Sequence, residues 1–193
     1  MFKKIDFKFD HIDIERLKGE QAERYGLPTC YLTHFMLKDF DYFKSLHAGK
    51  IKFNIMPSFA YYTEIQGTSG LPPHTDTGAM CALNCYLQAG DTTTTFYAKN
   101  DKTKMYAVDG EIDWKDLHVP ITGTLDFKNL DVIGEFKAND NESYLIRVDL
   151  LHSVTAPVGV RSMISYRWYD KSYGFDYSFQ DIIDSIELPN QKT

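Results

Sequence analysis

Two histidines and an aspartate are the residues of this sequence whose types and spacing could hold a reactive metal. His74 and Asp76 stand two positions apart in the segment PPHTDTG, and His152 lies far downstream. Alternate residues of an extended chain project to the same side, so His74 and Asp76 can converge on one point while Thr75 turns away. Two imidazoles and a carboxylate on one face suit non-haem Fe(II), because they leave positions open for O2 and a cosubstrate.

The segment that begins at His152 supports the choice of the third ligand. By itself His-x-Asp is a weak signal, and a histidine in a Gly/Pro-rich loop is more often only solvated. Here, however, His152 opens a strand-like run, a turn follows at residues 157–159, and Arg161 starts the next run. Strands that are far apart in sequence become neighbours in a jelly roll, so His152 can join His74 and Asp76.

Arg161 has a candidate role beside such a metal. A dicarboxylate cosubstrate that chelates the metal through its keto-acid end would extend its far carboxylate deeper into the fold, where guanidinium is the best partner. The neighbours Val160, Met163 and Ile164 indicate partial burial, which makes an unpaired arginine costly. The alternative is a surface charge on an edge strand. Arg167 is the second candidate for the same role, further along the same run.

Short strands must position these side chains. From residue 51 onward, runs rich in β-branched and aromatic residues alternate with turns of Gly, Pro, Asn and Asp. Many short strands without long intervening helices predict a mainly β fold of the jelly-roll type with short flanking helices. We expect one domain over residues 1–193, with a helical N-terminal part (about 1–50), a β core (about 51–170) and a C-terminal tail (171–193).

Three helical segments are expected around this core. Residues 10–25 combine charged residues with periodic apolar ones, and residues 38–46 form a second short segment that Asp39 could cap. The tail segment DYSFQDIIDSIEL can form a short amphipathic helix. The polar stretch 99–118 could cover the site and select substrate, or it could be a surface hairpin.

The candidate metal ligands and Arg161 together resemble the site of a known protein superfamily. The pattern His74-Thr75-Asp76, His152 and Arg161, in a strand-rich chain, resembles the 2-oxoglutarate and Fe(II)-dependent oxygenase superfamily. The stretch ALNCYLQAGDTTTTFY is similar to the second-strand region of that family, and HSVTAPVGVRSMISYRW resembles its His-x-Val…Arg-x-Ser ending. The resembling parts span roughly residues 60–169.

The resemblance implies a fold and a chemistry. The fold would be a double-stranded β-helix, which is a cupin-like jelly roll. His74, Asp76 and His152 would bind Fe(II), and Arg161 would bind 2-oxoglutarate. The reaction would couple oxidative decarboxylation of 2-oxoglutarate by O2 to hydroxylation of an unactivated C–H, with an amino acid or peptidyl residue as the preferred substrate class.

Two departures from the family pattern limit the resemblance. Met163 stands where many members have a serine that contacts the cosubstrate. The turn Gly90-Asp91-Thr92 replaces the Gly-Gly-Glu-Thr of prolyl-hydroxylase-like members, which argues against that assignment without affecting the metal ligands.

Two further residues are cosubstrate-binding candidates. Related enzymes often place a cosubstrate-binding tyrosine on the strand before the metal loop, and of Tyr61 and Tyr62 we favour Tyr62, with a packed aromatic strand as the alternative. Asn84 would share the facing of His74 and Asp76 if its strand runs without a bulge. A buried asparagine among apolar residues needs a partner, which could be the cosubstrate or the substrate.

Composition narrows the possible partners. The formal net charge of −6 and a pI of about 5.5 disfavour a nucleic-acid partner, because such a field repels phosphate backbones. Cys30, Cys81 and Cys85 are too few and too scattered for a disulfide framework, and they are expected as small buried residues. The N-terminus has no continuous apolar stretch, so we expect neither a signal peptide nor a membrane span, and a cytoplasmic protein that acts on a small-molecule or peptidyl substrate.

Two other functions are compatible with the sequence. One is a cupin-type metal-dependent enzyme that does not use 2-oxoglutarate, although such sites usually carry more histidines and a glutamate. The other is a non-catalytic jelly-roll binding module in which His74 and Asp76 are incidental. That alternative does not explain why three ligand types and a carboxylate-binding arginine occur in a workable order.

Overall fold

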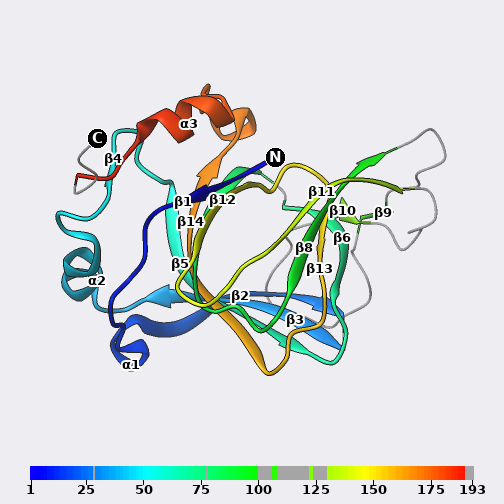
Figure 1. Ribbon diagram of the computed structural model, residues 1–193, viewed down its shortest axis with the longest axis horizontal. Coiled ribbons are helices and arrows are strands. Elements are labelled where there is room, and N and C mark those ends of the chain that lie inside the picture. The colour runs from blue at the N-terminus through cyan, green and yellow to red at the C-terminus, as the bar shows by residue number, and fades with distance from the viewer. Residues whose placement is uncertain (28, 77, 100–105, 108–121, 124–129, 190–193) are drawn as a thin grey trace.

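In a computed structural model the chain forms two antiparallel β-sheets that face each other, with short helices beside one of them (Figure 1). The structure describes residues 1–193 except 28, 77, 100–105, 108–121, 124–129 and 190–193. Because successive side chains of a strand point to opposite faces of its sheet, one set of residues on the larger sheet faces the space between the sheets and the other set faces the helices.

The larger sheet has seven strands, which include the first strand of the chain and the last strand of the β core. Its strands, in spatial order, are β1 (Phe2–Ile5), β12 (Ser143–Arg147), β7 (Ala79–Gln88), β14 (Val160–Tyr169), β5 (Phe59–Gly67), β3 (Cys30–Leu37) and β2 (Lys18–Leu27). The smaller sheet has six strands, in the order β11 (Leu130–Lys137), β8 (Thr93–Lys99), β13 (His152–Val154), β6 (Leu71–Thr75), β10 (Thr122–Gly123) and β9 (Tyr106–Ala107).

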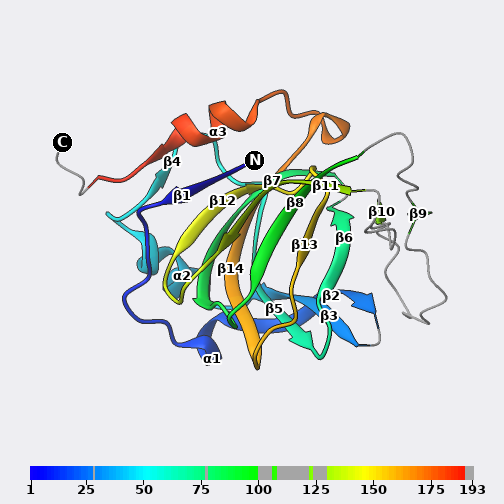
Figure 2. The ribbon, with the colours of Figure 1, turned by 45° about the vertical axis from the view of Figure 1, so that its right-hand side comes forward.

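The chain winds back and forth between these sheets. Strands β5, β7, β12 and β14 belong to the larger sheet, whereas β6, β8, β11 and β13 belong to the smaller one (Figure 2). From β5 to β8, and again from β11 to β14, each successive strand therefore crosses to the opposite sheet. This is the path of a double-stranded β-helix, and it confirms the predicted fold class.

Short helices and a two-stranded ribbon flank the larger sheet. They are α1 (Ile14–Leu17), α2 (Phe40–His47), the 3-10 turn η2 (Lys171–Tyr173), α3 (Phe179–Ser185), β4 (Lys52–Phe53) and β15 (Ile186–Glu187). The side chain of Asp39 accepts a hydrogen bond from the Tyr42 N–H and caps α2, as predicted. Helix α3 lies in the predicted tail segment, and its buried Ile182 packs into the core on the helix side.

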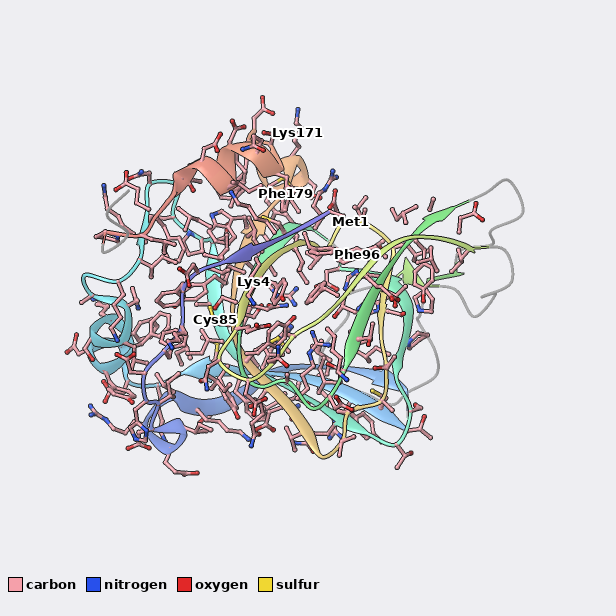
Figure 3. All side chains as sticks on the ribbon, in the orientation of Figure 1. Met1, Lys4, Cys85, Phe96, Lys171 and Phe179 are labelled. Atoms are coloured by element: carbon pink, nitrogen blue, oxygen red, sulfur yellow. The ribbon has the colours of Figure 1, made fainter. Side chains whose placement is uncertain are left out.

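Both faces of the larger sheet are covered. On β7, Cys81, Leu83 and Cys85 belong to the core that also includes residues of α2 and α3, whereas Ala82 and Tyr86 belong to the core between the sheets. Figure 3 shows side chains on both sides of this sheet, with Cys85 inside and the exposed Lys171 at the surface. The cysteines Cys30, Cys81 and Cys85 are buried and free, as expected for small core residues.

The N-terminal part corrects one expectation. Residues 1–50 are not mainly helical, because they supply β1, β2 and β3 to the larger sheet, and helix occupies only Ile14–Leu17 within the segment 10–25. The charged residues of β2 favour a helix locally, but β2 is an edge strand. One side of an edge strand stays open to solvent, so polar residues are tolerated there and pairing with β3 decides the structure.

Most of the stretch 99–118 lies outside the described residues, so its predicted role stays open. Among the residues that are described, no helix has the length and apolar character that crossing a membrane requires.

Candidate metal centre

His74, Asp76 and His152 come together where two neighbouring central strands of the smaller sheet meet, at the end of β6 and the start of β13. Strands β6 and β13 are antiparallel neighbours, and His152 stands directly opposite His74 in their register. Asp76 follows the end of β6, where its N–H donates to the Val148 carbonyl over 2.8 Å and fixes the loop. One ligand atom from each of the three residues lies within 4.8 Å of the others. The sheet therefore joins ligands that the sequence separates widely.

Backbone carbonyls fix how each imidazole is presented. The Nδ1 of His74 lies 2.7 Å from the carbonyl oxygen of Pro72, and the Nδ1 of His152 lies 2.9 Å from that of Leu150. Because a carbonyl can only accept, each Nδ1 carries the proton and donates. Each Nε2 then keeps its lone pair for a metal, which is the usual outer-shell arrangement of ligating histidines.

The electrostatics favour the protonation states that bind metal. Burial, and to a smaller extent the neighbouring His74, lowers the pKa of His152 to about 4, so His152 is neutral at pH 7. Burial alone would raise the pKa of Asp76, but the guanidinium of Arg167 and the two imidazoles outweigh it and hold that pKa well below its usual range. The site thus presents an ionised carboxylate beside two imidazoles, and this group could hold a metal ion.

Arg167 contacts the carboxylate of the group directly. Its Nη1 lies 2.8 Å from Oδ2 of Asp76, whereas Oδ1 faces Nε2 of His74 at 3.4 Å. One carboxylate oxygen is therefore engaged by a cation and the other faces His74. The structure places Arg167 beside the metal ligands, not in the deeper position that its candidacy as the cosubstrate arginine required.

Arg161 lies buried at the other end of the same cavity. Its side chain is almost inaccessible, with 2% of the residue surface exposed. Three hydroxyls accept hydrogen bonds from its guanidinium: Thr92 at 2.8 Å, Tyr86 at 2.6 Å and Thr94 at 3.1 Å. No carboxylate pairs with Arg161 among the described residues, and its Nε has no partner there. A buried cation whose hydrogen-bond partners in the described part of the chain are all neutral calls for an anion.

A cavity connects the metal ligands with Arg161. It is lined by residues from both sheets, and its polar members are Thr63, His74, Asp76, Asn84, Thr94, His152, Arg161, Ser165 and Arg167. Four buried polar atoms on its wall have no partner within the described part of the chain, and these are Asn84 Oδ1, Arg161 Nε, Ser165 Oγ and Arg167 Nε. Buried polar atoms are nearly always hydrogen-bonded, so this cavity suits a polar ligand.

Asn84 faces this cavity, as its spacing predicted. It stands directly opposite Ser165 in the register of β7 and β14, and both side chains line the cavity wall. Their oxygens, which have no partner among the residues that the structure describes, lie between the Arg161 end and the Arg167 end of β14. The contact that Asn84 makes with a cosubstrate or substrate stays a prediction.

The prediction for Tyr62 is wrong. Thr63 and Ile65 of β5 line the cavity, so Tyr62 projects to the opposite face of the sheet and packs into the core on the helix side. The tyrosine that reaches Arg161 is Tyr86 on β7, which sequence reasoning missed. A signal for it existed, because Tyr86 is two residues after Asn84 and therefore shares its facing.

Thr92 and Thr94 were also missed as partners of Arg161. They belong to the run TTTT that leads into β8, and Thr94 lines the cavity. In the sequence this run indicates only a strand, because threonine is common in strands for its β-branched shape. Because side chains alternate along the run, either Thr92 and Thr94 or Thr93 and Thr95 can face inward, and the sequence does not show which pair does.

No family model matches the chain, and no curated protein matches it. Among solved structures, the chain is similar to the X-ray structure of E. coli ycfD, with a TM-score of 0.39 and 12% sequence identity. The match covers 79% of this chain and 41% of that protein, so the chain spans less than half of its length.

Proposed function

We propose that this chain is a 2-oxoglutarate-dependent oxygenase that uses Fe(II) and O2 to hydroxylate an unactivated C–H of an amino acid or peptidyl residue. One observation supports this most: a three-ligand metal group shares a cavity with a buried arginine that lacks a carboxylate partner in the described chain. The three-ligand group suits a reactive metal, and the buried arginine suits a dicarboxylate whose other end reaches that metal.

The donor set favours Fe(II) over a structural metal. Structural zinc sites usually close around four protein ligands, whereas two imidazoles and one carboxylate on one side leave several positions open. In the proposed enzyme, His74 and His152 would hold the iron through Nε2, and Asp76 would hold it through a carboxylate oxygen. Arg167 keeps Oδ2 of Asp76 engaged, so that one oxygen is presented to the iron.

The two ends of the cavity match the two ends of 2-oxoglutarate. Arg161 would bind the far carboxylate, with Tyr86 and Thr94 fixing the orientation of the guanidinium. Between that end and the metal ligands, Asn84 and Ser165 offer oxygens that no described residue engages. When bound, iron supplies the activation of O2 that is coupled to oxidative decarboxylation of 2-oxoglutarate. The protein contributes position, charge balance and exclusion of water.

The experiment that tests this function needs no knowledge of the substrate. Purified protein is mixed anaerobically with Fe(II) and 2-oxoglutarate, and the weak visible charge-transfer band of the chelated metal is recorded. Succinate is then measured after O2 is admitted. The proposal expects a band that disappears in His74→Ala, and succinate formation that depends on 2-oxoglutarate. No band and no succinate would contradict it.

The same experiment separates the alternatives. A cupin-type enzyme that does not use 2-oxoglutarate would bind metal without the band, and a binding module would bind neither. A band that survives His74→Ala would show that the metal lies elsewhere. A cytoplasmic location and the lack of a nucleic-acid partner stay predictions that rest on the charge balance and the N-terminal composition.

A further inference from the structure

Two buried polar side chains outside the metal group, His34 on β3 and Thr63 on β5, contact each other directly. The Nδ1 of His34 lies 2.7 Å from the Oγ1 of Thr63, and each residue has only 1% of its surface exposed. The two residues stand opposite each other in the antiparallel register of β3 and β5. Of the two, Thr63 lines the cavity, so His34 supports a cavity residue from behind.

Thr63 is the polar residue on an otherwise apolar part of the cavity wall. The other cavity residues of β3 and β5 are Leu32 and Ile65, and Met163 stands opposite Thr63 on β14. A valine has nearly the shape of threonine and would fill the same wall without needing a partner. Exchange of both partners of a buried hydrogen bond for apolar groups of the same shape is nearly neutral for stability. Packing therefore gives no reason for the pair, whereas a cavity ligand that uses the hydroxyl does.

The protonation of His34 decides how the Thr63 hydroxyl can act. Burial and the nearby guanidinium of Arg167 hold the pKa of His34 well below its usual range, so its imidazole is neutral and carries one N–H. If that N–H is at Nδ1, it donates to Oγ1, and the Thr63 O–H is left to donate into the cavity. If the proton is on Nε2, Nδ1 accepts the Thr63 O–H, and Thr63 can then only accept from a ligand.

The chemistry of the proposed cosubstrate selects between these two arrangements. At pH 7 the polar groups of 2-oxoglutarate are two carboxylates and a keto oxygen, which accept hydrogen bonds and donate none. In the register of β5 and β14, Thr63 stands level with Met163, between the levels of Arg161 and Ser165. A ligand that extends from Arg161 toward the metal group therefore passes Thr63, and it requires a donor there.

We propose that His34 is a positioning residue of this site, which donates from Nδ1 to Thr63 and thereby directs the Thr63 O–H at bound 2-oxoglutarate. This rests on the proposed oxygenase function, because it takes 2-oxoglutarate as the ligand of the cavity. His34 acts through Thr63 alone, so its effect on binding disappears when the hydroxyl is absent.

NMR can detect the proton on His34 directly. Long-range ¹H–¹⁵N spectra of the zinc-loaded full chain, labelled with ¹⁵N-histidine, show which ring nitrogen of each histidine is protonated. The variant His34→Phe identifies the His34 signals by their loss. We expect His34 to be protonated at Nδ1 when 2-oxoglutarate is present. A proton on Nε2 would overturn the proposal.

Calorimetry measures the binding of 2-oxoglutarate to the same zinc-loaded chain, which requires neither iron nor turnover. Thr63→Val should raise the Kd by at least about 10-fold, because one hydrogen bond to a charged ligand is lost. His34→Phe keeps a ring to stack on Tyr61 but frees the hydroxyl, and it should raise the Kd by at least about 3-fold. The double variant should bind no more weakly than Thr63→Val, because His34 acts only through that hydroxyl.

Conservative variants and a matched histidine serve as controls. Thr63→Ser keeps the hydroxyl, and His34→Asn keeps an amide donor near the position of Nδ1, so both should recover most of the lost affinity. His47→Phe should leave the Kd unchanged, since His47 is a half-buried histidine of α2 whose ring contacts Tyr166 on the helix side. Thermal melts show whether each variant is folded, and His34→Leu replaces His34→Phe if the latter unfolds.

Two binding results would overturn this inference alone: a Kd that His34→Phe or Thr63→Val leaves unchanged, or losses that add in the double variant. Additive losses would mean that His34 supports the fold and does not orient the hydroxyl. A wild-type chain that binds no 2-oxoglutarate would instead reject the proposed function, and the cosubstrate contact of Thr63 together with it.

Discussion

Replacing Arg161 by methionine should separate cosubstrate binding from folding. The guanidinium has five N–H groups, and hydroxyls of Tyr86, Thr92 and Thr94 accept from three of them. Two donors are then left for a carboxylate. A hydrogen bond to a charged group contributes about 1.5–3 kcal/mol, so the loss of two should cost about 3–6 kcal/mol of 2-oxoglutarate binding. This corresponds to a rise of at least about 100-fold in Kd.

The effect on folding should be small and could have the opposite sign. Arg161 is buried without a carboxylate partner among the described residues, and exchange of a buried charge for an apolar side chain of similar volume is often neutral or stabilising. The three hydroxyls lose a donor, which offsets that gain. We therefore expect the free energy of unfolding of the metal-free protein, measured in urea without cosubstrate, to change by less than about 1 kcal/mol.

The assay is an anaerobic titration of 2-oxoglutarate into the Fe(II)-loaded protein, followed by the visible charge-transfer band. Arg147→Met is the matched control, because Arg147 pairs with Asp149 and does not line the cavity. It should leave the midpoint of the titration unchanged. The reasoning is refuted if Arg161→Met shifts the midpoint by less than about 3-fold, or if it mainly destabilises the fold and leaves cosubstrate affinity intact.

Three other predictions follow from the site. Arg167→Gln should weaken metal binding by about 10-fold or more, because Asp76 loses the ion pair that orients it; calorimetric competition with a chelator measures this, and unchanged affinity would contradict it. The metal-free protein should lose about 2 kcal/mol of unfolding free energy between pH 7 and pH 5, because burial lowers the folded-state pKa of His152 to about 4 while the unfolded chain takes up this proton near pH 6.5. That contribution is complete above about pH 6.5 and is lost as the pH falls toward 4, so His152→Asn should flatten the urea-derived profile. Gly78→Ala should destabilise the fold by at least about 1 kcal/mol, because φ is positive and the new Cβ meets the Tyr173 ring; a thermal melt like that of the wild type would argue against the close approach.

Local spacing was enough to predict which way neighbouring residues of the site face. His74 and Asp76 are two residues apart, and Asn84 keeps the inward facing of its strand, because side chains alternate strictly along an extended backbone. The Asp39 cap of α2 depends only on neighbouring residues and was predictable for the same reason. The mainly β fold class followed from the density of short strand-like runs.

Tertiary structure decided which face of each strand became the inner one. The larger sheet is buried on both sides, so β7 and β5 are nearly continuously buried and their sequences carry no alternation between apolar and polar residues. Without that alternation the sequence could not tell which of Tyr62 and Thr63 faces inward, and the shared facing of Asn84 and Tyr86 did not by itself show that Tyr86 reaches Arg161. The same limit explains why β2 was predicted as a helix. Its charged residues favour a helix locally, but pairing with β3 at the edge of the sheet makes it a strand.

The sequence by itself therefore determined the residue types, the local spacing of His74 and Asp76, and the class of chemistry they suit. Only the tertiary structure placed His152 opposite His74 and set Arg167 on Asp76. The physical reason is that alternation along a strand is a short-range property of the backbone, whereas strand order and register depend on burial and hydrogen bonding across the whole molecule.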